Sequence, residues 1–498
     1  MGCEAVGMTD IRNLRTRPWL GLFAVLTALI MNILDSTIVT VAAPSIQESL
    51  GGSYASIQWL SAGYTLALAT GLLTGGRLGD MFGRRRVLLV GVCGFVAASL
   101  ACAFAPTATA LIGARVLQGL FGAVMVPQGF GLIRNLFPPQ QIGKAFGALG
   151  PVIGLSTILG PIVAGVLIDA DVAGTGWRAV FLINLPMGAF AFLAGRAALP
   201  VGGGQRSQRL DVLGMLIAGV GMFLLVYPLV QGRDQGWPPS LFAMLGAAVV
   251  VLAGFVVYQL RRRASGRTPL VELSVFAKRS YASGVVFVIV FFGSIVGFSL
   301  SIGLFLQLGL GYSPMRASLT TTGWAVGAFL GSGFAATTMG KLGRKLLHIG
   351  LIGMAIGLVG IITVLSTTEV NQWTLLPALL VYGAGMGMIF VPLFDIIMGE
   401  IGDHEVGSAS SMLESLQQMG ASLGVAVLGT VFFSSLGARP LIGDFVGASR
   451  IVAVLALGLV AVAFALAFRL PRSARGHGAP APADNDVVAS DERVLVEA

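Results

Sequence analysis

The sequence is poor in charged residues, cysteine and histidine, and each shortage excludes a class of protein. Only 11% of its 498 residues are charged, whereas about a quarter are charged in a typical soluble domain, so most of the surface must face lipid. Three cysteines give no disulfide framework, because Cys3 is terminal and Cys93 and Cys102 lie too far apart along one predicted helix. Three histidines, in no zinc-like spacing, predict no metal site and no cofactor.

What the chain does contain is a succession of long apolar runs. It is 55% hydrophobic, with 70 glycines, and such small residues suit closely packed membrane helices. Apolar runs of about 18 residues or more are candidate membrane spans. They predict an all-α integral membrane protein with fourteen transmembrane helices, over residues 18–43, 56–76, 86–105, 108–132, 143–168, 179–199, 211–231, 241–260, 281–309, 316–339, 346–366, 373–399, 406–436 and 449–470.

The basic residues give an independent test of this count. When both termini are placed in the cytoplasm, most of the 31 Lys and Arg residues fall in the inner loops, as expected because Lys and Arg resist translocation. We therefore predict a multi-pass protein of the cytoplasmic membrane with both ends inside. The net charge of +9 then reflects topology, and we expect no nucleic-acid partner.

The segment 76–86 is the most informative short stretch. It joins the second and third predicted spans and reads Gly-Arg-Leu-Gly-Asp-Met-Phe-Gly-Arg-Arg-Arg. So short a connection predicts an antiparallel hairpin, and its arginines predict a cytoplasmic turn. On a second interpretation the basic residues set topology and do nothing else.

A weaker copy of this segment, residues 340–345, lies between the tenth and eleventh spans. The repeat predicts two six-helix bundles with two inserted central helices between them. The organisation that follows is a cytoplasmic N-terminal segment, an N-terminal bundle, the inserted pair with a cytoplasmic linker, a C-terminal bundle and a disordered cytoplasmic tail, over residues 1–17, 18–199, 200–268, 269–470 and 471–498.

Two opposite charges fall inside predicted spans at similar depth. Asp35 lies about eight residues from the outer end of the first span and Arg115 about seven from that of the fourth, which puts both roughly 10–12 Å below the outer surface. Equal depth permits an ion pair, and charges within a membrane are functional candidates. We weigh a static strut between helices against a proton-coupling pair whose strength changes with protonation.

Glu414 is the matching candidate in the second half of the chain. It lies near the middle of the thirteenth span, with Gln417 and Gln418 on the same helix face. No arginine occurs in that span, and an unpaired carboxylate in a membrane is protonated or faces water. Either state suits proton carriage or attraction of a cationic substrate. The alternative is a protonated carboxyl bonded to a neighbouring carbonyl.

Adaptable and polar side chains predict a substrate cavity of low specificity. The same methionines and aromatic residues are also compatible with ordinary helix packing. The candidate cavity residues are Met31, Asn32, Gln128, Phe130, Met386, Phe390, Gln417 and Gln418.

Several short motifs together resemble the fourteen-span drug/proton antiporters of the major facilitator superfamily. The 76–86 segment is similar to the signature loop of the superfamily, and residues 34–39 to a motif of the fourteen-span branch. Further matches are Trp59, Tyr64, Leu111, Arg115, Gln118, Gly119 and Pro127. The fifth span resembles the antiporter motif at Gly147, Gly160, Pro161 and Gly165, with Ser156 and Ala164 where glycine is usual.

This resemblance implies export of a hydrophobic or amphipathic compound, driven by the proton motive force through inward proton movement. It further implies that the 76–86 segment is a conformational latch that stabilises one alternating-access state. The latch residues would be Gly76, Asp80, Gly83, Arg84 and Arg85.

Three other functions are compatible with long apolar spans, and short sequence features distinguish them. A proton-coupled uptake symporter for a small organic solute would use the same fold, but the Gly-Pro pattern at 160–161 argues against it. A membrane enzyme would need a nucleophile–base or metal cluster that the three histidines do not supply, and an ATP-driven pump would need a G-x-x-x-x-G-K-[ST] loop, which is absent. We expect a monomer whose partners are protons, lipid and a small hydrophobic or cationic substrate.

Overall fold

The computed structural model describes residues 18–138, 141, 156, 159–201, 210–267, 269–271, 273–367, 370–401, 406–436 and 440–471. Within these ranges the chain is helical and contains no β-strand. The helices are rich in the apolar residues Ala, Leu, Val and Phe, which a lipid environment favours. A helix also satisfies its backbone hydrogen bonds internally, as lipid requires.

Among the described residues, the first part of the chain contains six labelled α-helices. They are α1 (Pro18–Leu50), α2 (Tyr54–Phe82), α3 (Arg84–Ala103), α4 (Ala108–Leu136), α6 (Ala179–Leu182) and α7 (Asn184–Ala198). A further apolar helix covers Leu159–Asp169. Two 3-10 turns, η1 (Val172–Gly174) and η2 (Gly176–Arg178), precede α6.

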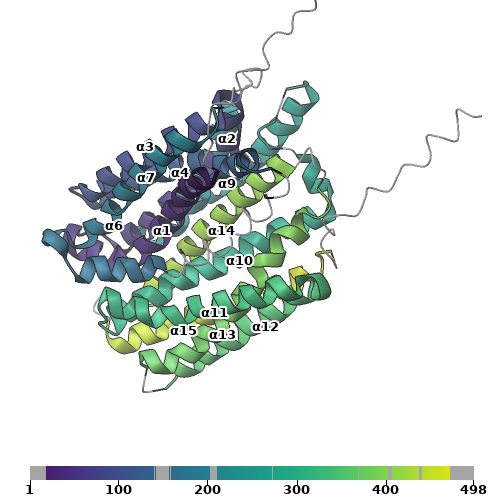
Figure 1. The fold of residues 1–498 in the computed structure, drawn as a ribbon. Coiled ribbons are helices and arrows are strands. Elements are labelled where there is room, and N and C mark those ends of the chain that lie inside the picture. The colour runs from purple at the N-terminus through teal and green to yellow at the C-terminus, as the bar shows by residue number, and fades with distance from the viewer. Residues whose placement is uncertain are drawn as a thin grey trace, which may run out of the picture.

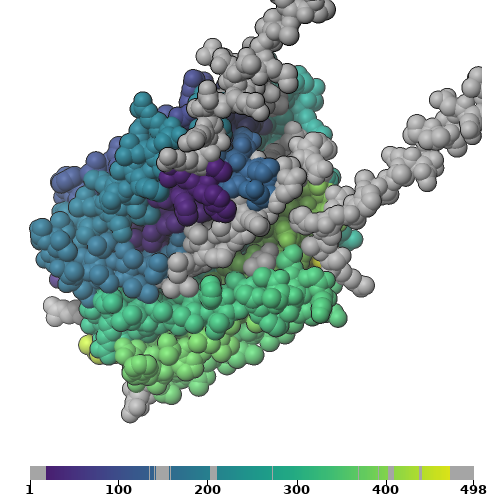
Figure 2. Space-filling model, in the orientation of Figure 1, coloured from purple at the N-terminus to yellow at the C-terminus, as the bar shows by residue number. Residues whose placement is uncertain are grey.

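The remaining described helices follow α7 in chain order. They are α8 (Val212–Gln235), α9 (Pro239–Ala264), η3 (Leu273–Ala277), α10 (Arg279–Leu304), the π-turn η4 (Phe305–Gly309), α11 (Pro314–Leu342), α12 (Lys345–Val364), α13 (Gln372–Met398), α14 (Val406–Ser434) and α15 (Ile442–Ala467). In Figure 1 the purple and blue helices of the N-terminal part lie together in the upper part of the view, and α10–α15, in green and yellow, lie below them. The space-filling view shows the same two masses (Figure 2).

Eleven candidate membrane spans are present among the described residues. Two further helices, α2 and α11, are each 29 residues long but less apolar. Most of the predicted fifth span, 143–168, lies outside the described residues. The all-helical prediction is therefore confirmed, whereas the count of fourteen is not.

The first helix is longer than predicted. It runs to Leu50, through Pro44, instead of ending near residue 43. The helix ends where Gly51 and Gly52 adopt φ values of 69° and 115°, a region that favours glycine.

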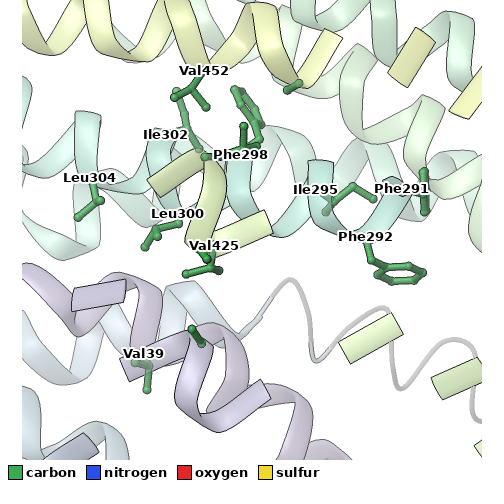
Figure 3. Packing of buried hydrophobic residues seen from close by; sticks show 14 of the residues in the cluster. Val39, Phe291, Phe292, Ile295, Phe298, Leu300, Ile302, Leu304, Val425 and Val452 are labelled. Atoms are coloured by element: carbon green, nitrogen blue, oxygen red, sulfur yellow. The ribbon is translucent and has the colours of Figure 1, made fainter. Parts of the chain in front are cut away.

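Two hydrophobic clusters hold the helices together. One lies within the N-terminal helices α1–α4 and α7 and includes Leu22, Phe95 and Ile133. The larger one joins both parts of the chain, since it contains residues of α1 and α2 as well as of α10–α15. Figure 3 shows Val425 of α14 beside Leu300 of α10, with Val39 of α1 on the neighbouring helix. The seam between the two parts is thus closed by apolar packing over at least this region.

The weak sequence repeat has a structural counterpart. α2 ends at Gly83, with φ 91°, and its N–H bonds to the carbonyl of Gly79 at 2.9 Å. α11 ends at Gly343, with φ 48°, and its N–H bonds to Met339 at 2.9 Å. A glycine with positive φ therefore follows the helix at both repeats. We call the end of the bundle that carries the 76–86 segment the loop end.

Candidate functional site

Asp35 of α1 and Arg115 of α4 form an ion pair whose side chains are 0% exposed. The ion pair that the equal depth of the two charges permits is therefore formed, and α1 and α4 are neighbours. Arg115 Nη1 donates to Asp35 Oδ2 and, at 2.6 Å, to Gln118 Oε1, while Nε donates to the carbonyl of Leu60 at 3.1 Å. The guanidinium carbon lies 4.1 Å from the ring centre of Tyr64. The cation is therefore held by carboxylate, amide, carbonyl and aromatic groups together.

The second carboxylate oxygen of Asp35 accepts bonds from two amides. Gln118 Nε2 donates to Asp35 Oδ1 at 2.7 Å and Asn184 Nδ2 donates at 3.0 Å. Both amides also donate to Ser99 Oγ, at 2.8 and 3.1 Å. Asn184 begins α7 and Ser99 lies in α3, so the centre joins α1, α3, α4 and α7. It also includes α2, through the carbonyl of Leu60. It stabilises a carboxylate inside the bundle rather than at its surface.

One atom of this polar centre is left over. Arg115 Nη2 is buried and has no hydrogen-bond partner among the described residues. Buried donors are normally satisfied, so this nitrogen marks the place where an additional acceptor would bind most readily.

The 76–86 segment is built around a second ion pair. Arg84 Nη2 lies 2.9 Å from Asp80 Oδ1, with the two side chains 38% and 41% exposed. Gly83 between them supplies the positive φ of the turn, and a side chain at Gly131 of α4 would overlap the Arg84 guanidinium. Arg84 is therefore clamped between Asp80 and α4. Two of the residues that the family resemblance assigns to the latch, Asp80 and Arg84, are thus bonded to each other.

Other residues of the segment contact distant parts of the chain. Arg77 donates to the carbonyl of Pro269, beyond α9, and Arg85 donates to the carbonyl of Arg196 near the end of α7. Gly76 lies in α2 close to Ser411 of α14, whose Oγ would stand 3.6 Å from a Cβ at that position. The segment thus contacts the N-terminal helices and the chain beyond α9, and it lies close to α14.

The glycines of the predicted antiporter motif permit close helix contacts. A side chain at Gly160 would overlap Thr37 of α1, and a Cβ at Gly165 would lie 2.6 Å from the Cα of Met315 in α11. Asp169 Oδ2 accepts a bond from the Met315 N–H at 3.2 Å. The helix Leu159–Asp169, which contains Pro161, therefore touches both parts of the chain at the end opposite the loop end. Gly147 lies outside the described residues.

Glu414, Gln417 and Gln418 all lie in α14 and are half-buried. Neighbouring Ser415 donates to the carbonyl of Ala69 at 2.6 Å, so this stretch of α14 packs on α2. Among the described residues Glu414 makes no hydrogen bond and no ion pair. The structure thus gives it no cationic partner within the described residues.

Three predicted cavity residues lie in the packed interior of the N-terminal helices. Met31 is fully buried, and Asn32 Nδ2 donates to Tyr64 Oη at 2.6 Å. Gln128 is 1% exposed, and its Nε2 donates to the carbonyl of Gly75 at 2.7 Å. That bond ties α4 to α2 next to the 76–86 segment.

The cavity residues of α13 pack among aromatic side chains. Met386 Sδ accepts a bond from Trp324 Nε1 at 3.2 Å, and the rings of Phe390 and Phe292 are 5.3 Å apart. The side chain of Phe130 lies outside the described part of the structure. None of the predicted cavity residues that the structure describes lines a cavity of about 550 Å³ that lies at the end opposite the loop end. Its lining includes Pro44, Gln47, Glu48, Gln307, Tyr312 and Pro314.

Comparison with known families decides what kind of protein carries this centre. The model of the Major Facilitator Superfamily matches residues 25–425. The chain belongs to the Major Facilitator Superfamily. It is accordingly a multi-pass membrane transporter and not an enzyme.

Several relatives of this transporter are named for antibiotic transport or resistance. It is 46% identical over 437 residues to a probable actinorhodin transporter of Streptomyces coelicolor, covering 87% of this chain and 76% of the relative. It is 36% identical to a tetracenomycin C resistance and export protein of Streptomyces glaucescens, covering 87% and 79%. It is 35% identical to a puromycin resistance protein of Streptomyces alboniger, covering 83% and 82%.

Solved structures agree on the fold of the transporter. A bacterial homologue of the human lysosomal transporter Spinster, in an inward-facing and unoccupied conformation, superposes with a TM-score of 0.64 at 16% identity, covering 91% of this chain and 96% of that chain. An auto-inhibited peptide transporter superposes with a TM-score of 0.66 at 14% identity, covering 93% and 99%. At such identities the likeness shows the fold alone.

Sequence reasoning missed much of the setting of Asp35 in the transporter. Gln118 follows Arg115 by three residues, so helical spacing places both side chains on one face of α4. This spacing could have identified Gln118 as a member of the centre. Ser99 and Asn184 come from other helices, and no spacing within one helix could have assigned them.

Proposed function

We propose that this transporter exports a hydrophobic or amphipathic drug or antibiotic across the cytoplasmic membrane, in exchange for protons, by alternating access. The observation that carries the proposal is the buried centre of Asp35 and Arg115. An ion pair removed from water is costly to maintain in a membrane protein and commonly marks an ion or proton pathway. The relatives named for actinorhodin transport and tetracenomycin C export supply the substrate class.

In this proposal the loop end faces the cytoplasm, together with both termini. Two six-helix bundles, 18–199 and 269–470, would rock about a substrate near the middle of the membrane, as in other transporters built from repeats. The inserted pair and linker, 200–268, connect the bundles. The driving force is the proton motive force, with no bound cofactor.

Protonation of Asp35 would weaken its bond to Arg115 and release the bonds that converge on its carboxylate. Because these bonds join α1, α3, α4 and α7, the N-terminal helices would then repack. Proton arrival would thereby favour one of the two access states. Once the proton has left, Arg115 would pair with the carboxylate again.

Residues of the second half, together with Asn32 of α1, would recognise the cargo. Glu414 is half-buried and has no cationic partner among the described residues, so it would attract a cationic group of the substrate. Gln417 and Gln418 would offer hydrogen bonds, with Asn32, Met386 and Phe390 as further candidates for the cavity wall.

The 76–86 segment would act as the latch of the cycle. The pair Asp80–Arg84 and the contacts of Arg85 and Gly76 would stabilise the state in which the loop ends of the helices are packed together. Breaking and remaking these bonds would accompany each turnover. The close approaches at Gly160 and Gly165, in the helix that contains Pro161, would stabilise the state in which the opposite ends of the helices are packed together.

The experiment that tests this function uses inverted membrane vesicles with an imposed pH gradient. The probes are actinorhodin, tetracenomycin C, puromycin and a panel of hydrophobic dyes. Gradient-dependent uptake into the vesicles, against the concentration of the compound, is the expected result. If every compound that is transported moves at a rate independent of the pH gradient, proton coupling is contradicted. Transport out of the vesicles indicates an uptake symporter.

A further inference from the structure

A single peptide group beyond α9 is held from both sides. Arg77 of α2 donates to the carbonyl of Pro269, and the N–H of Leu270 donates to Gln259 Oε1 of α9 at 2.7 Å. This carbonyl and this N–H belong to the same planar peptide unit, which cannot flex between them. The end of α2 and the end of α9 are therefore connected through one rigid group.

The connection continues into the start of α8. Gln259 Nε2 donates to Asp211 Oδ2 at 2.9 Å, and Asp211 Oδ1 caps α8 by accepting the Gly214 N–H at 3.0 Å. Tyr258 Oη donates to the same oxygen at 2.8 Å, and Arg262 Nη1 lies 3.4 Å from it. Gln259 is 0% exposed and Asp211 1% exposed. Polar groups so deeply buried persist because every bond among them is made.

Gln259 stands out against the rest of its helix. Leu241, Ala248 and Gln259 are the buried residues of α9, while Phe242, Val250 and other apolar side chains of the helix are exposed. A helix that faces lipid along most of its length needs no buried glutamine for its own stability. The polar contact at its loop end therefore points to a task beyond packing.

The partner helix α8 lies on the seam between the two parts of the chain. It contacts α2 through the rings of Trp59 and Tyr227, 6.0 Å apart, and α14 through Thr430, whose Oγ1 donates to the carbonyl of Leu229 at 2.6 Å. The inserted pair thus contacts both parts, and its loop end is bonded to the chain beyond α9 that Arg77 also contacts.

We propose that Gln259 and Asp211 are positioning residues of the latch: through the 269–270 peptide they hold Arg77, and with it the 76–86 segment, in its packed position. The inserted pair α8–α9 is then a working part of the transport cycle and not a spacer. The effect on turnover rests on the latch role proposed above, whereas the structural effect does not.

The structural effect is measured in the full chain without substrate. Spin labels are attached at Phe82 and Ser265, which are exposed near the ends of α2 and α9, after replacement of the native cysteines. Distances are recorded by double electron–electron resonance in lipid nanodiscs. We expect one narrow distribution in the parent and a broadened one in Gln259→Leu and in Arg77→Ala.

The double variant and a matched control sharpen the test. If Gln259 and Arg77 act through the same peptide, Gln259→Leu combined with Arg77→Ala broadens the distribution no further than either change alone. The control is Gln235→Leu, at the other end of the pair, where Nε2 donates to Tyr227 Oη at 3.3 Å on the exposed surface. Its distribution should match the parent. An unchanged distribution in Gln259→Leu, or additive broadening in the double variant, overturns the proposal.

Transport supplies the second readout. Gln259→Leu should lower the maximal rate several-fold with the half-saturating concentration near that of the parent, and adding Arg77→Ala should lower it no further. If Gln259→Leu cannot be produced, Arg77→Ala, compared with the exposed neighbour variant Arg86→Ala, carries the distance test alone. A broadened distance distribution with an unchanged transport rate contradicts a role of Gln259 in turnover, while the structural link to Arg77 stands. The distance result does not depend on whether the protein exports its substrate in exchange for protons.

Discussion

Asp35 and Arg115 lie 80 positions apart in the chain, and their side chains meet with no exposed surface on either. The pair lies among helices of the N-terminal part and not between the two parts of the chain. Its influence on transport must therefore pass through the packing of α1, α3, α4 and α7. A change in the charge of Asp35 alters bonds in all four helices at once, which suits a centre that converts protonation into helix movement.

The close approach of α2 and α4 predicts a sharp difference between two glycines. A side chain at Gly75 would overlap the backbone carbonyl of Ala123, whereas a Cβ at Gly113 of α4 meets nothing within 4 Å. Gly75→Ala should cost about 1–3 kcal/mol through overpacking, and Gly113→Ala should be neutral or stabilise by up to about 1 kcal/mol. Thermal unfolding in detergent micelles measures both. Equal midpoints for the two variants would contradict the described packing.

The latch role of the 76–86 segment predicts a kinetic defect. Asp80→Asn removes the charge that holds Arg84 at 2.9 Å, so we expect slower cycling with near-normal substrate binding. Rates in proteoliposomes and equilibrium binding of the same compound separate the two effects. Arg86→Gln, an exposed change in the same turn, is the control. If turnover in Asp80→Asn equals that of the control, the basic residues set topology alone.

How much of this site could be predicted from sequence depends on whether its members share a helix. Asp35 and Arg115 could be paired because depth along two helices follows from counting residues. Asp80 and Arg84 were brought together by the family resemblance, which assigned both to the latch. The structure contains both ion pairs.

The centre around Asp211 shows where sequence reasoning stops. Asp211 stands just before an apolar run, which marks a helix start, but its partners Tyr258 and Gln259 lie more than forty positions away. Periodicity says which face of a helix is polar, and it does not say which distant side chain that face meets. The predicted end of the first span, residue 43, was wrong for a local reason. α1 continues through Pro44 to Leu50, and the glycine pair that follows ends the helix.

The Asp211 centre predicts a dependence of stability on pH. Burial opposes its charge, but bonds from Gln259, Gly214 and Tyr258 and the charge of Arg262 outweigh burial and lower the pKa of Asp211 below its ordinary value. A carboxyl group of lowered pKa stabilises the fold above its unfolded pKa of about 3.9, and this contribution is lost as pH falls through the folded pKa.

Asp211→Asn should therefore lower the midpoint of thermal unfolding at neutral pH, and its deficit relative to the parent should shrink on acidification below about pH 4. Gln235→Leu, remote from this centre, should show no such pH-dependent difference. A deficit that stays constant from neutral to acid pH would mean that the charge of Asp211 contributes nothing to the fold.

Glu414 predicts a difference between substrates. Its half-buried carboxyl group has no cationic partner among the described residues, so Glu414→Gln should reduce export of cationic compounds severalfold more than export of neutral ones. Inhibition constants for a matched pair of charged and uncharged dyes measure the effect. Gln418→Leu, one turn along α14, controls for loss of cavity shape. Equal losses for both dyes would remove the role in charge recognition.

The central claim is that Asp35 couples substrate export to proton movement, and counting protons tests it most directly. Proteoliposomes carrying the parent or Asp35→Asn are loaded with a pH-sensitive dye, and the proton flux that accompanies substrate addition is recorded. We predict a substrate-dependent flux in the parent and none in Asp35→Asn, with substrate binding retained by the variant. The same number of protons moved per substrate in both proteins would contradict the account.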